Sequence, residues 1–267
     1  MKIHKHKTDQ HSIDRINENE LVLLLSKDRA YLVTVKKNKI CEFDLGTVNC
    51  NKIIGKRFGE IIESHLKRPL LLVKPSIIDF LNKKTKIMPQ AVRPKDAALI
   101  LAFTGINKES VVVEGGTGSA WLTIFLANYV KKVYSYEIRQ DFFKNAKINV
   151  KASSLRNIVL KNKDITQGID EKNIDLVICD MIKAETVVKH AAKALKPGGW
   201  FVVYSPYIEQ VKAVTEEINK YSFALPFTVE NILRYWEVRE HTLPKRKGLM
   251  HTGFLTFARR LQNLKDI

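Results

Sequence analysis

The stretch "VVVEGGTGSAWLTIFL", residues 111–126, decides the fold of the larger part of this chain. Three valines before an acid predict a buried strand, the glycines predict a tight turn, and the apolar run that follows predicts a helix. This order is typical of nucleotide-binding sites. Gly116 and Gly118 occupy the first two positions of Gly-x-Gly-x-x-Gly, but Trp121 occupies the third. Because a dinucleotide needs the third glycine for close packing of helix and strand, Trp121 argues against a dinucleotide.

Length and composition predict a cytoplasmic protein without a metal site. With 267 residues, 45% of them hydrophobic, the chain can bury a sizeable core. No apolar run is long enough to cross a membrane, and the charged start lacks the apolar segment of a secretory signal. An odd number of cysteines without a CxxC pair indicates neither a disulfide framework nor a zinc ribbon: Cys41, Cys50 and Cys179. Three histidines in the polar start are interpreted as a solvated tail: His4, His6 and His11.

The charge balance indicates a polyanionic partner. Forty-five Lys and Arg residues against 28 Asp and Glu residues give a net charge of +17, and the isoelectric point is near 9.7. Nucleic acid is the natural partner for such an excess. The alternative is a lysine-rich proteome, in which the charge reflects the organism and no particular ligand.

The order of patterns predicts a small β domain followed by an α/β domain. Residues 1–75 hold short alternating or apolar runs, which predict a small antiparallel sheet or barrel, and residues 76–107 form a linker and a helix over "PKDAALILAFTGI". Residues 108–267 alternate strands with helices, as in a parallel sheet covered on both faces. Parallel strands are expected at 111–114, 132–137, 158–163, 174–180 and 200–205, with helices beginning near Ser119, Asp141, Thr186 and Ile208. The helix from Thr186 is expected to stop at 196–199, and the runs at 230–240 and 253–260 to close the sheet as an antiparallel hairpin.

Four acids stand at the carboxyl ends of successive predicted strands: Glu114, Glu137, Asp164 and Asp180. Because a ligand lies along that edge of an open α/β sheet, we expect them to converge on one crevice. Glu137 lies 19 residues after Gly118, where an acid accepts hydrogen bonds from ribose hydroxyls, and Asp164 then falls beside the base. A lone Asp is more often a helix N-cap, but four acids in register favour a site. Carboxylates would repel phosphates, whereas they suit the ribose, amino group and sulfonium of S-adenosylmethionine.

The joint order of these motifs resembles the TrmI-type tRNA (adenine-N1)-methyltransferases. The shared features are Glu-x-Gly-x-Gly-Ser at 114–119, "YSYEIR" with Glu137, "DIT" with Asp164, "KPGGWFVVYSPYIEQV" and a near-terminal "HTGFL". Upstream, "QAVRPKDAALIL" is similar to a Gln-x-x-Tyr-Pro-Lys-Asp segment of that family, and "LGTVNCNKIIGKRFGEII" is similar to a loop of its small β domain. The likeness covers the chain from about Glu20 to Arg260.

The resemblance implies a class I, Rossmann-like methyltransferase domain with an antiparallel terminal hairpin, preceded by a small all-β domain. It further implies a homotetramer that binds S-adenosyl-L-methionine and methylates N1 of T-loop adenines in tRNA, at positions 57, 58 or both. The family's cofactor residues correspond to Glu114, Gly116, Thr117, Gly118, Ser119, Glu137 and Asp164. Asp180 corresponds to the acid placed against the target base.

The chemistry of N1 methylation suits Asp180. Adenine N1 is a weak nucleophile, and a carboxylate that accepts a hydrogen bond from the exocyclic amino group orients the base and offsets its growing positive charge. The target must be extruded from the folded RNA. We predict that three aromatic side chains stack on the base: Tyr204, Tyr207 and Trp236. Tyr204 is also assigned to catalysis, together with Asp180. Each of the three could instead serve ordinary packing.

The sequence departs from the family at two walls of the base pocket. The fourth-strand acid is usually followed by Pro-x-Pro-Trp, whereas this chain reads "CDMIKAET", and Arg93 replaces a tyrosine before Pro-Lys-Asp. Either the enzyme is active with a remodelled pocket in which Arg93 contacts the base or a phosphate, or the chain is a non-catalytic tRNA-binding subunit. A methyltransferase of the same fold acting on protein or a small molecule is a further alternative. The four retained acids favour an active tRNA methyltransferase.

A basic loop, "PKRKG" at 244–248, joins the last two predicted strands. Lys245 and Arg246 are predicted to bind tRNA phosphates, and His251 of "HTGFL" to contact the substrate. The alternative for the loop is a solvated hairpin tip.

Overall fold

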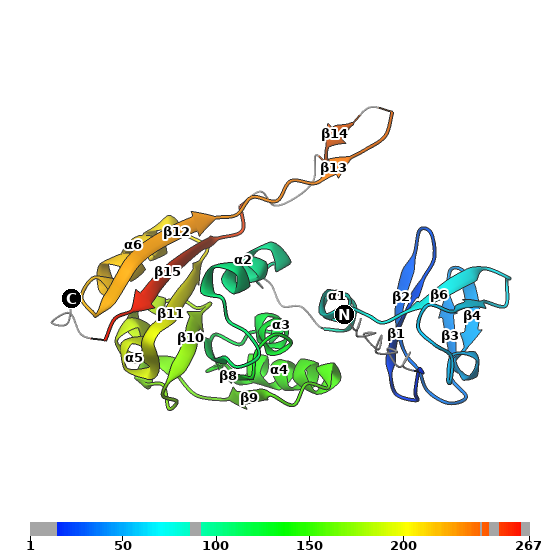
Figure 1. Ribbon diagram of the computed structural model, residues 1–267, viewed down its shortest axis with the longest axis horizontal. Helices are drawn as coiled ribbons and strands as arrows, with labels where there is room; N and C mark the ends of the chain where they lie inside the picture. Colours follow the sequence, from blue (N-terminus) through cyan, green and yellow to red (C-terminus); the bar gives the residue numbers. More distant parts are fainter. Residues whose placement is uncertain (1–14, 86–91, 241, 246–250, 263–267) are drawn as a thin grey trace, which may run out of the picture. The chain divides into compact units, whose positions relative to one another are not determined.

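The chain divides into two compact units, Met1–Lys83 and Lys84–Ile267. The computed structural model describes residues 15–85, 92–240, 242–245 and 251–262 (Figure 1). His4, His6, His11 and Arg246 lie outside the described residues.

The first unit is a small antiparallel β structure, as its alternating runs predict. Strand β1 pairs antiparallel with both β2 and β6 in a sheet of order β2-β1-β6-β5, and β3 pairs with β4. Its core is an apolar cluster that includes Leu24, Leu70 and Leu72, each fully buried. The elements are β1 (Leu21–Leu25), β2 (Ala30–Thr34), β3 (Ile40–Phe43), β4 (Gly46–Asn49), η1 (Cys50–Lys52), β5 (Ile61–Glu63), β6 (Pro69–Val73) and α1 (Ile77–Lys84).

The second unit is built on a seven-stranded sheet of order β12-β15-β11-β10-β7-β8-β9. Five strands are parallel, and β15 joins the sheet antiparallel between β11 and β12. The order reverses between β7 and β10, where a ligand crevice is expected. The strands are β7 (Val111–Gly115), β8 (Lys132–Tyr136), β9 (Ile158–Lys161), β10 (Ile174–Cys179), β11 (Leu195–Ser205), β12 (Phe223–Glu230) and β15 (Phe254–Arg260).

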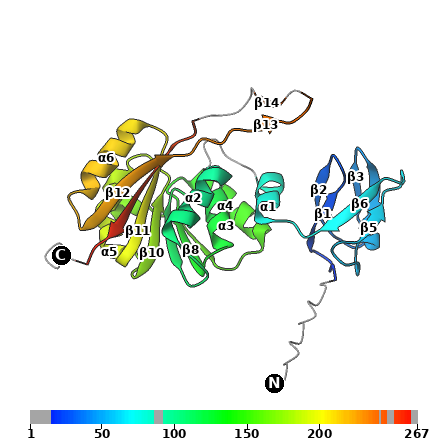
Figure 2. The same ribbon diagram turned by 45° about the horizontal axis from the view of Figure 1, so that its top comes forward.

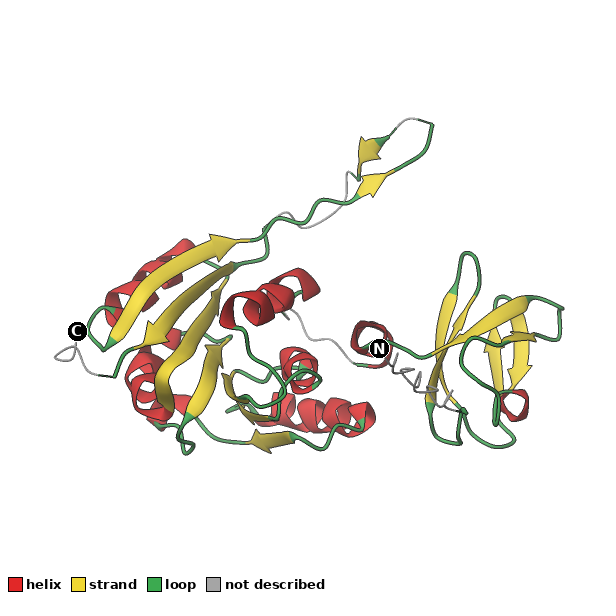
Figure 3. Ribbon diagram, viewed as in Figure 1, coloured by secondary structure: helices red, strands yellow, loops and turns green. Residues whose placement is uncertain are grey.

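Helices cover both faces of this sheet (Figures 1 and 3). On one face Phe103 of α2 packs against Phe257 of β15, and on the other Val214 of α6 joins the core around Phe201. The family-like fold expected from the sequence is therefore present. The helical elements are α2 (Pro94–Thr104), α3 (Trp121–Ala127), α4 (Gln140–Ser153), η2 (Ile165–Gln167), η3 (Ala184–Val187), α5 (Val188–Ala194) and α6 (Ile208–Ile218).

Two sequence-based boundaries were wrong. The strand expected at 230–240 lies earlier, as β12, and only the short β13 (Trp236–Glu237) falls in the predicted range, paired with β14 (Leu243–Pro244) in a projecting arm (Figure 2). A proline and a bulge interrupt β12: Leu225 has φ +50° and the pairing shifts between Ala224 and Phe227. The helix expected to end at 196–199 ends at Ala194, because Leu195 is already extended and opens β11.

No helix within the described residues is long and apolar enough to cross a membrane.

Candidate active site

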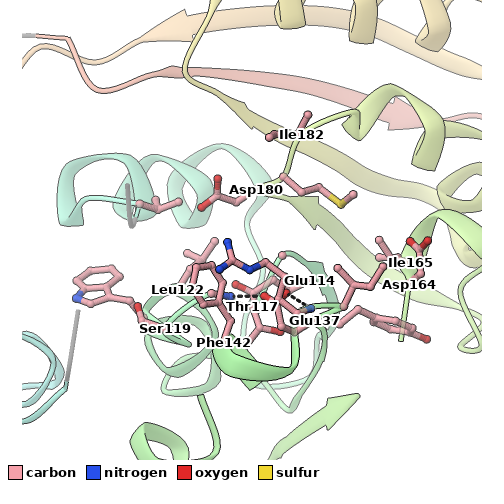
Figure 4. A pocket seen from close by; sticks show the side chains of 18 of the residues that line it. Glu114, Thr117, Ser119, Leu122, Glu137, Phe142, Asp164, Ile165, Asp180 and Ile182 are labelled. Carbon is pink, nitrogen blue, oxygen red and sulfur yellow. Dashed lines mark hydrogen bonds between the residues drawn. The ribbon is translucent and has the colours of Figure 1, made fainter. Parts of the chain in front are cut away.

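A cavity of about 410 Å³ lies where β7, β8 and β10 end, a size typical of small-molecule sites. In Figure 4, Asp180 and Ile182 line one side of it, and Glu114, Thr117 and Glu137 lie across from them. The four acids predicted to converge all line this cavity. The lining residues are Val92, Glu114, Gly116, Thr117, Gly118, Ser119, Trp121, Leu122, Tyr136, Glu137, Ile138, Arg139, Phe142, Lys163, Asp164, Ile165, Asp180, Met181, Ile182, Pro206 and Gln210.

The glycine turn brings backbone directly against the end of β10. A Cβ built on Gly116 would lie 2.1 Å from the backbone oxygen of Asp180, and Gly116 has φ +88°, so only glycine fits. The hydroxyls of Thr117 and Ser135 lie 2.6 Å apart, and Asn149 of α4 donates to the backbone oxygen of Ser119 at 2.8 Å. The turn is therefore held in place by β8 and α4 as well as by its own strand.

The residues that depart from a phosphate-binding loop have clear positions. Ala120 is fully buried in the left-handed conformation, φ +60°, which costs a residue with a Cβ about 1 kcal/mol. Trp121 begins α3, lines the cavity and stacks on Phe125 with ring centroids 5.7 Å apart. An indole thus occupies space that a dinucleotide site would leave to a close helix–strand contact.

Glu137 follows the last residue of β8 and is fixed by two backbone donors. Its Oε2 accepts from the amide of Gly118 at 2.9 Å, and its Oε1 accepts from the amide of Arg139 at 2.8 Å. The side chain is buried, yet it lines the cavity. Since each carboxylate oxygen can accept more than one hydrogen bond, both retain capacity for ligand hydroxyls.

Glu114, near the end of β7, is the most deeply buried of the four acids, at 1% exposure. Its Oε2 accepts from the hydroxyl of Ser135 at 2.6 Å and from that of Thr123. Burial, with a smaller contribution from the nearby charges of Asp180 and Glu137, raises the pKa of Glu114 to about 8 in spite of these two bonds. The arrangement favours a protonated Glu114 at neutral pH.

Asp164 is an N-cap, as a lone Asp often is, and also lines the cavity. Its Oδ1 accepts from the amide of Thr166 at 2.9 Å and from the Thr166 hydroxyl at 2.7 Å, at the start of η2. These bonds lower the pKa of Asp164, so the carboxylate is ionised. Both bonds use Oδ1, and a hydrogen bond from the side chain of Gln167 lowers the pKa of Asp164 as well.

Asp180 follows β10 directly and its amide donates to the backbone oxygen of Gly115 at 2.9 Å. Its carboxyl lines the cavity, and burial raises its pKa to about 7. The next two residues, Met181 and Ile182, complete this wall, and Ile182 is 78% exposed. Lys183 then adopts the left-handed conformation, with φ +61°, where the chain turns into η3.

Tyr204 lies beside the cavity and is absent from its lining. Its hydroxyl donates to the backbone oxygen of Thr252 at 2.5 Å, and a Cβ on Gly253 would lie 2.6 Å from its ring. Burial raises the pKa of Tyr204 to about 12, while the charges of Asp180 and Arg93 also act on it. Arg93, the exposed N-cap of α2, therefore lies within electrostatic range of this cluster, next to the lining residue Val92.

The Pro-Lys-Asp segment fixes α2 to the C-terminal strands. Lys95 and Asp96 form a buried ion pair with Nζ and Oδ1 2.7 Å apart. Thr252 donates to Asp96 Oδ2 at 2.9 Å, and Asn231 donates to the backbone oxygen of Lys95 at 2.9 Å. The segment thus ties the start of α2 to the loop after β12 and the loop before β15.

The remaining predicted substrate residues lie around the rim or away from it. His251 bonds Glu230 through Nδ1 at 2.6 Å and the backbone oxygen of the lining residue Pro206 through Nε2 at 3.0 Å. These contacts raise the pKa of His251. Tyr207 is 60% exposed at the N-cap of α6. Trp236, which is 54% exposed, and Lys245 belong to the projecting arm. Neither residue lines the cavity, although the sequence predicted that both contact the substrate.

Among the lining residues with charged or amide side chains, three were not predicted from the sequence: Arg139, Lys163 and Gln210. The first two each lie one or two residues from a predicted acid, and that proximity was the available signal. Arg139 has its guanidinium carbon 3.7 Å from the centroid of the Phe142 ring. The cavity mouth is therefore less uniformly acidic than the four acids alone suggested. Within the described residues there is no cluster of three or more His, Cys, Asp or Glu side chains that could hold a metal ion.

The chain is similar in sequence to known tRNA methyltransferases. Residues 80–250 match the family described as the tRNA methyltransferase complex GCD14 subunit. The chain is 34% identical to the tRNA (adenine(57)-N(1)/adenine(58)-N(1))-methyltransferase TrmI of Methanocaldococcus jannaschii, over 88% of this chain and 94% of that protein. It is 31% identical to the tRNA (adenine(58)-N(1))-methyltransferase TrmI of Thermus thermophilus, over 90% and 96%.

Two solved structures are similar over nearly the whole chain. A SAM-dependent O-methyltransferase of Thermotoga maritima superposes with a TM-score of 0.81 at 28% identity, covering 94% of this chain and 96% of that one. The tRNA (m1A58) methyltransferase TrmI of Aquifex aeolicus gives a TM-score of 0.77 at 24% identity, covering 94% and 100%, which shows a shared fold.

Proposed function

The chain belongs to the family of the tRNA methyltransferase complex GCD14 subunit, and we propose that it methylates N1 of a T-loop adenine in tRNA, at position 57, 58 or both. The methyl donor is S-adenosyl-L-methionine. The observation that carries the proposal is the position of Asp180, a partly exposed carboxyl at the end of β10, facing the glycine turn across one cavity.

The residues of the cavity fit the methyl donor. We propose that residues 116–119 enclose its methionine part, because the glycine turn exposes backbone there, and that Glu137 binds the ribose hydroxyls with its fixed oxygens. Asp164, whose ionised carboxylate lines the cavity, is proposed to accept from the adenine amino group. Glu114 supports this part of the cavity through its hydrogen bond with Ser135 of β8. When bound, the donor supplies a methyl group that its sulfonium already activates.

Asp180 is proposed to act on the target base. A carboxylate that accepts from the exocyclic amino group orients N1 toward the methyl group and offsets the positive charge that the product carries. The raised pKa of Asp180, about 7, shows how strongly its surroundings disfavour an isolated charge. A positive charge arriving beside it therefore favours the carboxylate form, which is the form the reaction needs.

The neighbours of Asp180 are proposed to shape the pocket for the base. Tyr204 acts through position, since its hydroxyl is engaged with Thr252 and its ring packs against Gly253. Exposed Ile182 stands where the family's stiff loop would stand and offers an apolar surface to a flipped base. Arg93, exposed at the start of α2, is available to a phosphate or to the base itself.

The RNA partner is supported by charge and by exposed side chains. The net charge of +17 suits a polyanion. We propose that Tyr207, His251, Lys245 and Arg246 contact tRNA, with the last of these outside the described residues. Cytoplasmic residence is part of the same proposal.

A homotetramer is proposed from the projecting arm. Six apolar side chains on the arm, within the described residues, are exposed in the single chain: Ile232, Leu233, Tyr235, Trp236, Val238 and Leu243. Surfaces of this kind are commonly covered by another chain. Analytical ultracentrifugation should give a mass of four chains, and a monomer at micromolar concentration would contradict this part.

A second reaction class, O-methylation, is raised by the Thermotoga maritima structure. A hydroxyl must lose a proton on methylation, whereas adenine N1 carries none. Methylated product released as 2′-O-methylnucleoside would favour this alternative.

A methyl-transfer assay with a paired variant tests the proposal. Purified protein is incubated with unmodified tRNA and methyl-labelled donor, and label in tRNA is counted. We expect incorporation by the wild type and by Asp28→Asn, an exposed carboxyl in the first unit, and none by Asp180→Ala. Calorimetry should show that Asp180→Ala still binds the donor. Heat of donor binding without any incorporation by the wild type would instead support a non-catalytic subunit.

A further inference from the structure

Gln210 holds a buried acceptor that the protein leaves unsatisfied. Its Oε1 is inaccessible to solvent and has no hydrogen-bond partner within the described residues, although Gln210 lines the cavity. Buried polar atoms are rarely left in this state, because the lost hydration is not replaced. The one other such side-chain atom in the described residues is the indole nitrogen of Trp200, which packs against Phe227 and Phe257 away from the cavity.

The usual local role of a glutamine at this position is not taken. Gln210 is the third residue of α6, where Gln or Glu commonly reaches back to the N-cap residue in a capping box. Here the N-cap is Tyr207, which makes no side-chain cap bond, and the Oε1 of Gln210 accepts nothing from it. Helix capping therefore does not explain the orientation of this side chain.

The fold fixes Gln210 on the Asp180 side of the cavity. Helix α6 packs on the sheet through buried Val211, Val214 and Ile218, which fixes the position of the helix that carries Gln210. Gln210 and Pro206 continue from the end of β11, which pairs with β10, the strand that carries Asp180. The glycine turn and Glu137 belong to β7 and β8, on the other side of β10.

We propose that Gln210 is a substrate-binding residue: its side-chain amide turns toward the cavity when the base enters, and Oε1, closed to solvent in the ligand-free chain, then accepts a hydrogen bond from the exocyclic amino group of the target adenine. This inference rests on the proposed function. The two N–H bonds of the amino group point in different directions. Asp180 accepts a hydrogen bond from one of them, so a second acceptor is needed for the other. Two acceptors at this position would select adenine against guanine and hypoxanthine, which present an acceptor oxygen there.

An amino group of the methyl donor could also donate a hydrogen bond to Oε1, and the experiment separates the two sources. We compare wild type, Gln210→Met, which removes the acceptor with little change in size, and Glu209→Met, a control at the exposed neighbouring position. Each is assayed with tRNA that carries adenine, or purine without the amino group, at the target position. Donor affinity is measured by calorimetry.

The expected result is a loss specific to the amino group. With adenine tRNA, Gln210→Met should lower kcat/KM about tenfold, the usual effect of one lost hydrogen bond, whereas with purine tRNA it should change kcat/KM less than twofold. Glu209→Met should leave the ratio between the two tRNAs unchanged. Donor affinity should stay within twofold. The melting temperature of the ligand-free Gln210→Met protein should equal or exceed that of the wild type, because an unsatisfied buried acceptor is removed.

Three outcomes would overturn the assignment. Equal losses with adenine and purine tRNA would remove the amino group as partner, and a tenfold weaker donor affinity would assign Oε1 to the methyl donor. A clearly lower melting temperature would indicate a structural hydrogen bond. If the wild type forms no 1-methyladenosine at all, the proposed function fails first; if it does form it with unchanged discrimination, only the role of Gln210 is lost.

Discussion

Replacing Asp180 by Asn should stabilise the ligand-free protein while abolishing methyl transfer. The substitution keeps the shape of the side chain and removes a carboxyl whose charge the fold disfavours. Burial raises the pKa of Asp180 from the ordinary 3.8 to about 7. A carboxyl with a raised folded-state pKa destabilises the fold when ionised, so the gain from Asn is absent at low pH and grows as the pH rises from about 4 toward 8.

The magnitude follows from the two pKa values. The difference between 3.8 and about 7 corresponds to about 4 kcal/mol at pH 8. Because the Asp180 side chain is partly exposed, solvent screening reduces this to about 2 kcal/mol. At pH 5 the expected gain falls below about 1 kcal/mol. Removing this charge also lowers the cost of ionising Glu114, whose pKa Asp180 helps to raise.

Urea denaturation followed by tryptophan fluorescence is the assay. All three tryptophans, Trp121, Trp200 and Trp236, lie in the second unit, so the signal reports the unit that contains the site. Equal stability of Asp180→Asn and wild type at pH 8, or a gain that is larger at pH 5, would refute the burial argument. Glu209→Gln controls for the loss of one negative charge.

The other predictions rest on separate contacts. Gly116→Ala should lower the free energy of unfolding by more than about 2 kcal/mol and abolish donor binding. The Cβ of Gly118→Ala would meet nothing within 4 Å, so this variant should lose only about 1 kcal/mol, because of its φ of +54°. Equal losses of the two variants in denaturation would contradict this. Lys95→Met should destabilise the protein by about 3 to 5 kcal/mol by leaving Asp96 buried without its ion pair, and a loss below 1 kcal/mol would show the pair to be dispensable. The contribution of His251 to stability should be complete below about pH 6.5 and be lost as the pH rises through its raised pKa; His251→Gln should remove that slope, and a parallel pH profile would count against it.

The sequence predicted the site best where chemistry coincides with regular structure. Glu114, Glu137 and Asp180 fall at strand ends, and because parallel strands end at one edge, their convergence follows from periodicity alone. Asp164 fits both the N-cap interpretation and the site interpretation, since it is the N-cap of η2 and also lines the cavity. The strand that became β12 was misplaced because Pro226 is typical of a turn in sequence, whereas in the structure it lies within a strand interrupted at the left-handed Leu225.

The contacts that were missed depend on tertiary structure. Tyr204 stands at a strand end, which suggested a place in the pocket, but its hydroxyl is directed to Thr252, 48 residues away. Gln210 resembles a capping residue in sequence, and only the packing of α6 places it in the cavity wall. The direction of these two side chains is set by neighbouring helices and strands, and a local sequence pattern carries no information about those neighbours.

Identification of the methylated nucleoside distinguishes N1 methylation of adenine from every other methyl transfer to tRNA. Unmodified tRNA treated with the wild-type protein and methyl donor is digested to nucleosides, which are separated and weighed by mass spectrometry against standards. We expect 1-methyladenosine in the wild-type digest and its loss in that of Asp180→Asn. A different methylated nucleoside, or 1-methyladenosine undiminished in Asp180→Asn, would contradict it.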